Sequence, residues 1–184
     1  MNPTLIHTQS GLSELKLFFA LSRTPHGLPD MATPALAAVF AVDPQPSFPP
    51  LILLSLWLFF WEIGGQNTPN DWADIEEDRI LQATTIPVRF GPVLADGVIF
   101  FSLLLAVILN GISVGLPPVG TRFAGVAASL GAGIYLLLIP AYRLYRTKGR
   151  MQALALFNSA SYYPITWLAV VIIAACTRCL KGIT

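Results

Sequence analysis

Charged side chains are scarce in this sequence. Lysine, arginine, aspartate and glutamate make up 11% of its 184 residues, whereas hydrophobic residues make up 54%. Soluble domains carry about 25% charged residues, so the composition excludes an ordinary soluble fold. The mean hydropathy of +0.65 agrees with this. We therefore expect an integral membrane protein.

Cysteine and histidine are also rare. The two cysteines, Cys176 and Cys179, form a lone CxxC, and His7 and His26 are far from it in the sequence. A zinc site needs about four ligands, and no second pair completes one, so we interpret the cysteines as packing or incidental thiols. The net charge of +1 gives no reason to expect nucleic acid as a partner.

Acidic charge, in contrast, is concentrated in residues 67–91, which we call the acidic segment. It contains five of the ten acidic residues of the chain, Asp71, Asp74, Glu76, Glu77 and Asp78. On one helix at about 100° per residue, a single stripe would hold Asn67, Asp71, Asp74 and Asp78. Like charges at this spacing repel, so the stripe favours a bound cation, and oxygen ligands suit Mg²⁺. The alternative interpretation is a solvated loop that sets topology.

Apolar runs predict the architecture, because about 20 apolar residues cross a bilayer as a helix. The predicted spans cover residues 24–42, 50–66, 93–114, 123–141 and 153–177. The expected fold is therefore an all-α, multi-span transmembrane bundle of about five helices, forming one domain over residues 1–184.

Basic residues predict the orientation of this bundle, because short cytoplasmic loops carry the excess of lysine and arginine. With a cytoplasmic N-terminus, the outer segments contain only Arg122, Arg178 and Lys181. The inner segments contain the other eight basic residues, Lys16, Arg23, Arg79, Arg89, Arg143, Arg146, Lys148 and Arg150. This orientation places the acidic segment on the cytoplasmic side. We expect the inner membrane of a bacterium as the location.

The stretch GGQNTPNDWADIEEDRILQATTIPVRFG, residues 64–91, closely resembles the second aspartate-rich motif of the UbiA family of intramembrane prenyltransferases. Asp74 and Asp78 fit its DxxxD element, and Asn67, Asn70 and Asp71 fit the polar turn before it. The later spans resemble the last three helices of the family. Upstream, residues 21–26 are similar to the entry of its first helix.

The resemblance implies a reaction and a set of roles. Family members transfer a polyprenyl group from an allylic diphosphate to an acceptor, most often an aromatic acid or quinone precursor. It implies Mg²⁺ as cofactor, bound by Asp71, Asp74 and Asp78, with Asn67 and Asn70 beside the substrate. Arg79 and Arg89 would face the diphosphate, and Arg23 would contact the acceptor. Arginines that set topology or reach lipid headgroups are the alternative for all three.

The chain also departs from the family pattern. The family has nine helices and an earlier aspartate-rich motif, so the resemblance implies a shortened member that lacks about four helices between Ala38 and Pro50. Three hypotheses follow: a working prenyltransferase that pairs two copies as a homo-oligomer, an inactive remnant, or a non-catalytic membrane protein that binds cations or lipids.

Overall fold

The computed structural model describes residues 48–115 and 123–181, and within these ranges every regular element is helical. In chain order these are α3 (Phe48–Trp61), η2 (Glu62–Asn67), α4 (Thr68–Ala73), α5 (Ile75–Ile80), α6 (Ile86–Phe90), α7 (Pro92–Gly115), α8 (Phe123–Gly133), η3 (Ile134–Leu138), α9 (Ile139–Thr147), α10 (Arg150–Ser161) and α11 (Tyr163–Lys181). The prediction of an all-α bundle is confirmed for this part of the chain. The predicted span over 24–42 and Arg23 lie outside the described residues.

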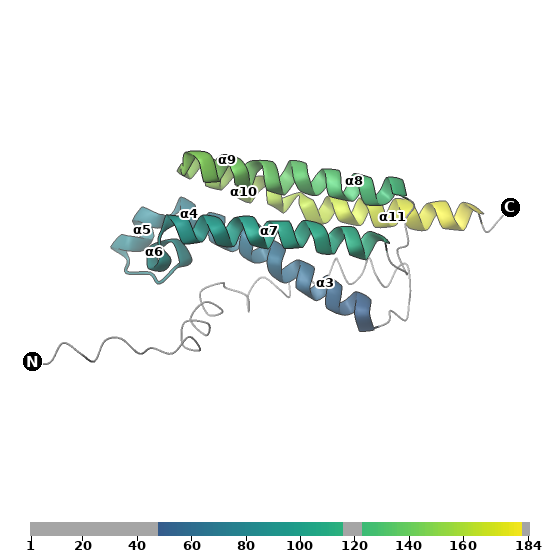
Figure 1. Ribbon diagram of the computed structural model, residues 1–184, viewed down its shortest axis with the longest axis horizontal. Coiled ribbons are helices and arrows are strands. Elements are labelled where there is room, and N and C mark those ends of the chain that lie inside the picture. Colours follow the sequence, from purple (N-terminus) through teal and green to yellow (C-terminus); the bar gives the residue numbers. More distant parts are fainter. Residues whose placement is uncertain (1–47, 116–122, 182–184) are drawn as a thin grey trace, which may run out of the picture.

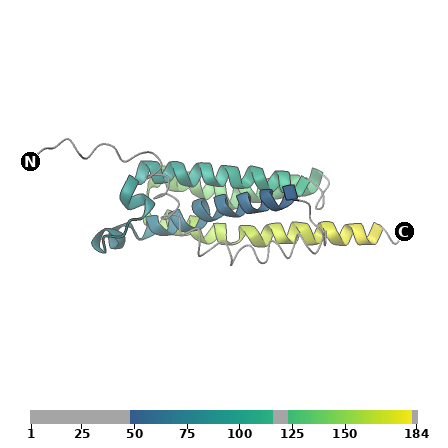
Figure 2. The same ribbon diagram turned by 90° about the horizontal axis from the view of Figure 1, so that it is seen from below.

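The long helices run side by side along the length of the molecule (Figure 1). From α3 the chain continues through the π-helical turn η2 into α4, and from α8 through the π-helical turn η3 into α9. The short helices α5 and α6 project beyond one end of the bundle (Figure 2), and the turn from α9 to α10 lies at that same end. One end of the molecule therefore carries both the acidic segment and this turn.

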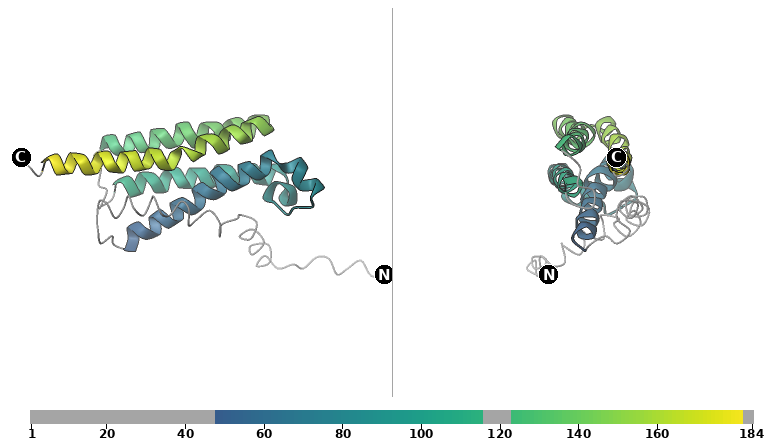
Figure 3. Two further views of the ribbon diagram at one scale, coloured as in Figure 1. Left: turned by 180° about the vertical axis from the view of Figure 1, so that it is seen from behind. Right: turned by 90° about the vertical axis from the view of Figure 1, so that its right-hand side faces the viewer.

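The core between the long helices is aromatic. Trp57 and Trp61 of α3 stack with ring centroids 6.1 Å apart, and the centroid of Trp167 of α11 lies 4.7 Å from that of Trp57. Tyr163 is 1% exposed, and its hydroxyl accepts a 2.7 Å hydrogen bond from the amide of Asn110 in α7. This cluster joins α3, α7 and α11, and the right-hand view of Figure 3 looks along the bundle.

Two prolines remove the backbone N–H that would bond a helix carbonyl four residues earlier, and a side chain of a neighbouring helix donates to that carbonyl. Proline has no N–H to offer to the carbonyl four residues earlier. For Pro164 that carbonyl belongs to Ala160, and it accepts a 2.9 Å hydrogen bond from the indole N–H of Trp61. For Pro140 it belongs to Leu136, and it accepts a 2.8 Å bond from the Ser159 hydroxyl. Both bonds join different helices, because a buried carbonyl without a partner is costly in an apolar medium.

This arrangement predicts a coupling between Trp61 and Pro164. Trp61→Phe removes the donor to the buried Ala160 carbonyl, and we expect it to lower stability by about 1–3 kcal/mol. In a Pro164→Ala background the new backbone N–H can bond the same carbonyl, so the cost of Trp61→Phe should fall by about 1 kcal/mol. A double-mutant cycle on midpoints of denaturation in detergent measures this coupling. An equal cost in both backgrounds would contradict it.

The outer surface of the bundle is apolar. Large hydrophobic side chains that are more than 60% exposed include Phe101 of α7, Phe123 of α8, Tyr135 of η3, and Ile165 and Ile173 of α11. A soluble monomer rarely exposes this much apolar surface on several sides, whereas a bundle surrounded by lipid does.

Two helices of the described ranges are long and apolar enough to cross a membrane, Pro92–Gly115 and Phe123–Thr147. They coincide with the predicted spans over 93–114 and 123–141. The span over 50–66 falls on α3 and η2, and the span over 153–177 is divided by the turn at Tyr162 between α10 and α11. These last two remain predictions.

Candidate functional site at the acidic end of the bundle

The acidic segment is not one continuous helix, and the prediction of a single stripe is wrong on this point. The helix α4 ends at Ala73 and α5 begins at Ile75, because Asp74 between them has φ −103° and ψ 15°. Aspartate is common at helix starts, where its side chain usually caps the free N–H groups. Here the Asp74 side chain makes no such cap. The break places the predicted aspartates in three different environments.

Asp71 is the most deeply placed of the three. It lies on α4 and is 1% exposed, among residues such as Trp72 and Ala73 that are also buried. A carboxylate is costly to bury and is retained mainly where it has a task or a partner. The helix α4 packs against α10 and α7, so Asp71 lies at the junction of three helices.

Asp78 is held by the return of the chain toward the bundle. The hydroxyl of Thr85 donates a 3.0 Å hydrogen bond to its carboxylate, and the N–H of Ala83 donates a 2.8 Å bond to its carbonyl. Between them Gln82 has a left-handed φ of 54°. The threonine just before α6 therefore fixes the orientation of the Asp78 side chain.

Asp74 is linked to the α9–α10 turn by Arg150. One guanidinium nitrogen lies 3.5 Å from the Asp74 carboxylate, and the other donates a 3.0 Å hydrogen bond to Glu77. A hydrogen bond from its own backbone N–H, and after it the Arg150 contact, lower the pKa of the Glu77 carboxyl. The sequence analysis gave Arg150 only a role in setting membrane topology. Its positive charge and its place at the end of a span were signals that it could meet the acidic segment.

A second ion pair fixes the same turn to α7. Lys148 pairs with Asp96, whose side chain is 3% exposed, and the ammonium lies 5.4 Å from the centre of the Tyr145 ring. Lys148 itself has a left-handed φ of 51°. Together Lys148 and Arg150 connect α7, the α9–α10 turn and the acidic segment.

The remaining predicted residues lie around this end without converging on one point. The amide of Asn67 donates a 3.3 Å hydrogen bond to Glu62, a carboxylate that is 3% exposed. Asn70 of α4 is half-buried and Arg89 of α6 is exposed. Arg79 pairs with Glu76 at 2.9 Å, on the outer surface of α5. Glu62 was not predicted as a site residue, although it is the one charge in its apolar run.

The carboxylate oxygens of the acidic segment are the kind of ligand that Mg²⁺ prefers. Their number suits a site that the substrate completes. Within residues 48–115 and 123–181, no three side chains of histidine, cysteine, aspartate or glutamate lie close enough together to hold a metal ion. Magnesium sites usually take one or two carboxylates, and phosphate oxygens and water complete the octahedron. Two of the predicted aspartates with a diphosphate would satisfy this requirement.

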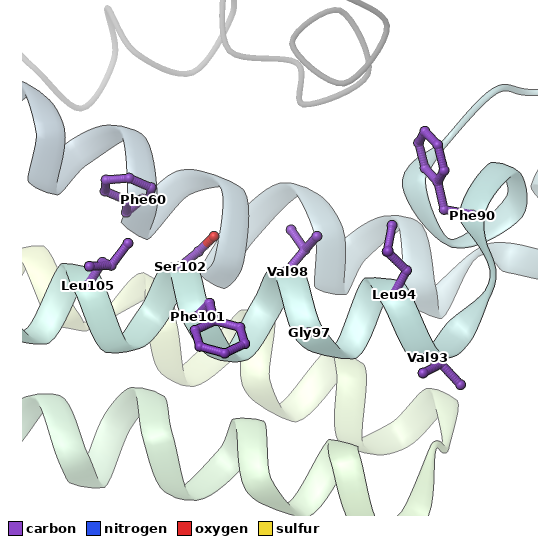
Figure 4. Close-up of a pocket in the computed structure, with 9 residues that line it drawn as sticks. All are labelled: Phe60, Phe90, Val93, Leu94, Gly97, Val98, Phe101, Ser102 and Leu105. Carbon is purple, nitrogen blue, oxygen red and sulfur yellow. The ribbon is translucent and has the colours of Figure 1, made fainter. Parts of the chain in front are cut away.

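An apolar groove of about 620 Å³ begins beside the acidic segment and runs along α7 (Figure 4). We call it the aromatic groove, because Phe90 of α6, Phe101 of α7 and Phe60 of α3 line it. Leu94, Val98 and Leu105 of α7 continue the lining along the helix. The groove offers a long apolar ligand a path from the acidic end toward the middle of the bundle.

The apolar helical bundle with its acidic end defines a membrane protein of the helical-bundle class. Residues 19–163 match the UbiA prenyltransferase family, which is most of the chain, so the protein belongs to this family. The expected resemblance is thereby confirmed, and with it a membrane-embedded protein of the prenyltransferase type. No curated protein and no solved structure matches the chain.

The contacts of Arg150 predict that it orders the acidic segment. Arg150→Gln should speed hydrogen exchange of the α5 amides at least about threefold at neutral pH, because short exposed helices open readily once their tertiary contacts are lost. Arg146→Gln is the control, because among the residues that the structure describes Arg146 bonds Tyr142 on its own helix and no carboxylate. Equal exchange in both variants would contradict the role.

Acid should weaken the same contact. Because folding lowers the pKa of Glu77, the Arg150 contact contributes above the unfolded-state pKa of this group and is lost as the pH falls through the lowered value. The Arg150→Gln variant should lose this part of the pH response. Hydrogen exchange of the α5 amides, compared with the wild type at each pH, measures the loss.

Proposed function

We propose that this protein transfers a polyprenyl group from its allylic diphosphate to an aromatic or quinone-precursor acceptor inside the membrane, with Mg²⁺ as cofactor. The family match, which includes the whole acidic segment, carries this proposal. The acidic end and the adjoining aromatic groove support it, because the substrate combines a highly charged head with an apolar tail.

The head of the substrate would bind at the acidic segment. Our proposed metal ligands are Asp71, Asp74 and Asp78, of which any two would complete a magnesium site together with the diphosphate. Asn67 and Asn70 are our proposed substrate contacts. Bound Mg²⁺ would neutralise the diphosphate as negative charge develops on it. Asp74 and Asp78 are one helical turn apart, and the bonds from Arg150 and Thr85 orient their carboxylates before substrate arrives.

The tail would lie in the aromatic groove. Prenyl transfer breaks the C–O bond between the allylic carbon and the diphosphate, which leaves with the electron pair. The acceptor carbon then bonds to the allylic carbon and releases a proton. A groove lined by Phe60, Phe90 and Phe101 would keep water from the allylic cation during this interval. Arg79 and Arg89, on either side of the turn that returns the chain to α6, are our proposed contacts of the departing diphosphate.

The orientation completes the proposal. We place the acidic end on the cytoplasmic side of a bacterial inner membrane, with five spans. The basic α9–α10 turn lies at the acidic end, so this end of the bundle carries most of the positive charge, as expected of the cytoplasmic side. The acceptor contact that we assign to Arg23 belongs to the same side.

The direct test is prenyl transfer by purified protein in lipid nanodiscs. Labelled polyprenyl diphosphates of several lengths, Mg²⁺ and a panel of aromatic acceptors should give a labelled product that chelation of Mg²⁺ abolishes. Diphosphate binding without product for any acceptor would instead support the non-catalytic alternative. Absence of both binding and product would leave the inactive remnant.

A further inference from the structure

A second groove lies on another part of the surface, between the η3–α9 rod and α10. It has a volume of about 360 Å³, and its lining includes Tyr135, Ile139, Arg143, Met151, Ala155 and Ser159. None of these residues belongs to the acidic segment or to the aromatic groove. We call it the Arg143 groove.

The local sequence explains why a groove forms here. Pro140 leaves the Leu136 carbonyl without its usual backbone donor, and the helix passes through the π-helical turn η3 just before it. Ser159 of α10 donates to that carbonyl, so the two helices are joined at the floor of the groove. Small Ala155 lies one turn earlier on α10 and leaves space above that contact.

The rim of the groove faces the surroundings of the bundle. Tyr135 is 70% exposed and Met151 is 72% exposed. Because the protein is membrane-embedded, the exposed Tyr135 meets lipid acyl chains, whereas Met151 lies at the end near the α9–α10 turn. Tyr142 and Tyr145 are also exposed near the end of α9, where aromatic side chains commonly mark the level of the lipid headgroups.

Arg143 differs from the other basic residues of this region. Lys148 and Arg150 pair with carboxylates, and Arg146 donates to the Tyr142 hydroxyl. The guanidinium of Arg143 makes no ion pair or hydrogen bond with any residue in the described part of the chain. The groove, which Gln152 and Ser159 also line, therefore holds a guanidinium whose charge no described residue neutralises, and arginine binds phosphate well because of its planar fork of donors.

We propose that the Arg143 groove binds an acidic phospholipid of the surrounding bilayer, with the phosphate against Arg143 and one acyl chain along Tyr135 and Ile139. The charge of Arg143 and its position at the headgroup end of the groove favour an anionic lipid over a zwitterionic one. The site is independent of the proposed prenyl transfer, because it shares no residue with the acidic segment.

Native mass spectrometry of the purified protein tests this site. Phosphatidylglycerol and phosphatidylcholine with identical acyl chains are added separately, and the fraction of lipid-bound protein is measured. We expect phosphatidylglycerol to bind at least about fivefold more tightly. We expect Arg143→Gln to remove most of that preference, and Arg143→Lys to keep part of it. Arg146→Gln, the same charge change one turn along α9, should alter binding less than about twofold.

Two further measurements keep the test decisive. Ala155→Phe fills the groove without changing charge, so it should weaken the binding of both lipids. The melting temperature of each variant without lipid shows whether it folds. An excess of farnesyl thiodiphosphate should not displace phosphatidylglycerol. Equal losses in Arg143→Gln and Arg146→Gln would mean a diffuse surface charge effect, and displacement by the prenyl analogue would mean a substrate groove. Either result would overturn the proposal.

Discussion

Replacing Asp78 by asparagine should lower the rate of prenyl transfer by about 100-fold or more. The change removes one negative charge but keeps the size of the side chain and an oxygen that can accept the Thr85 hydrogen bond. The fold should therefore survive, while the stabilisation of charge at the diphosphate is lost. Losing one such electrostatic contact typically costs about 10²–10³ in rate.

Glu76→Gln is the matched control for this experiment. It removes the same charge two residues earlier, where Glu76 pairs with Arg79 in the described part of the chain and its side chain is 74% exposed. We expect its rate to stay within about threefold of the wild type. Rates are measured at saturating Mg²⁺ with labelled prenyl diphosphate, and binding of unreactive farnesyl thiodiphosphate is measured in parallel. Similar losses in both variants would mean that total charge, and not the Asp78 position, is what matters.

Substituting Gly64 by valine should destabilise the bundle by about 3 kcal/mol or more. A Cβ at this position would lie 2.8 Å from the Cβ of Ser102 and 2.9 Å from the carbonyl oxygen of Ile99. The second of these atoms is backbone and cannot turn away, so η2 and α7 would have to separate. The acidic segment follows η2 directly, so its position should shift as well.

Gly131→Ala is the comparison, since a Cβ there meets nothing within 4 Å. Alanine also forms helices better than glycine, so this variant should be neutral or more stable by up to about 1 kcal/mol. Denaturation midpoints of both variants in the same detergent give the answer. A Gly64→Val protein as stable as the wild type would show that η2 and α7 do not pack this closely.

The sequence predicted the class of fold because lipid simplifies the pattern. Backbone groups in hydrocarbon must bond within a helix or a closed barrel, so a long uncharged run such as 93–114 permits few structures. The same reasoning identified the acidic segment, because five carboxylates in an apolar chain are conspicuous. The family resemblance then followed from the order of residues in that segment.

The geometry of the site could not be predicted in the same way. Helical periodicity placed Asp71, Asp74 and Asp78 on one stripe, but the periodic pattern shows neither the backbone break at Asp74 nor the approach of Arg150 from another helix. The carbonyls that prolines leave to distant donors are equally hidden in the sequence, such as that of Leu136 in η3, which accepts from Ser159. Tertiary contacts of this kind leave almost no local signal in the sequence.

The most direct test of the account is a titration of Mn²⁺, a paramagnetic substitute for Mg²⁺, followed by its electron spin resonance. Free Mn²⁺ is counted in lipid nanodiscs with and without protein, and with and without farnesyl thiodiphosphate. We predict that protein and analogue together bind Mn²⁺ at least about tenfold more tightly than either alone, and that Asp78→Asn abolishes the gain. If farnesyl thiodiphosphate binds the protein equally tightly after all divalent cations are chelated, the proposed metal site is contradicted.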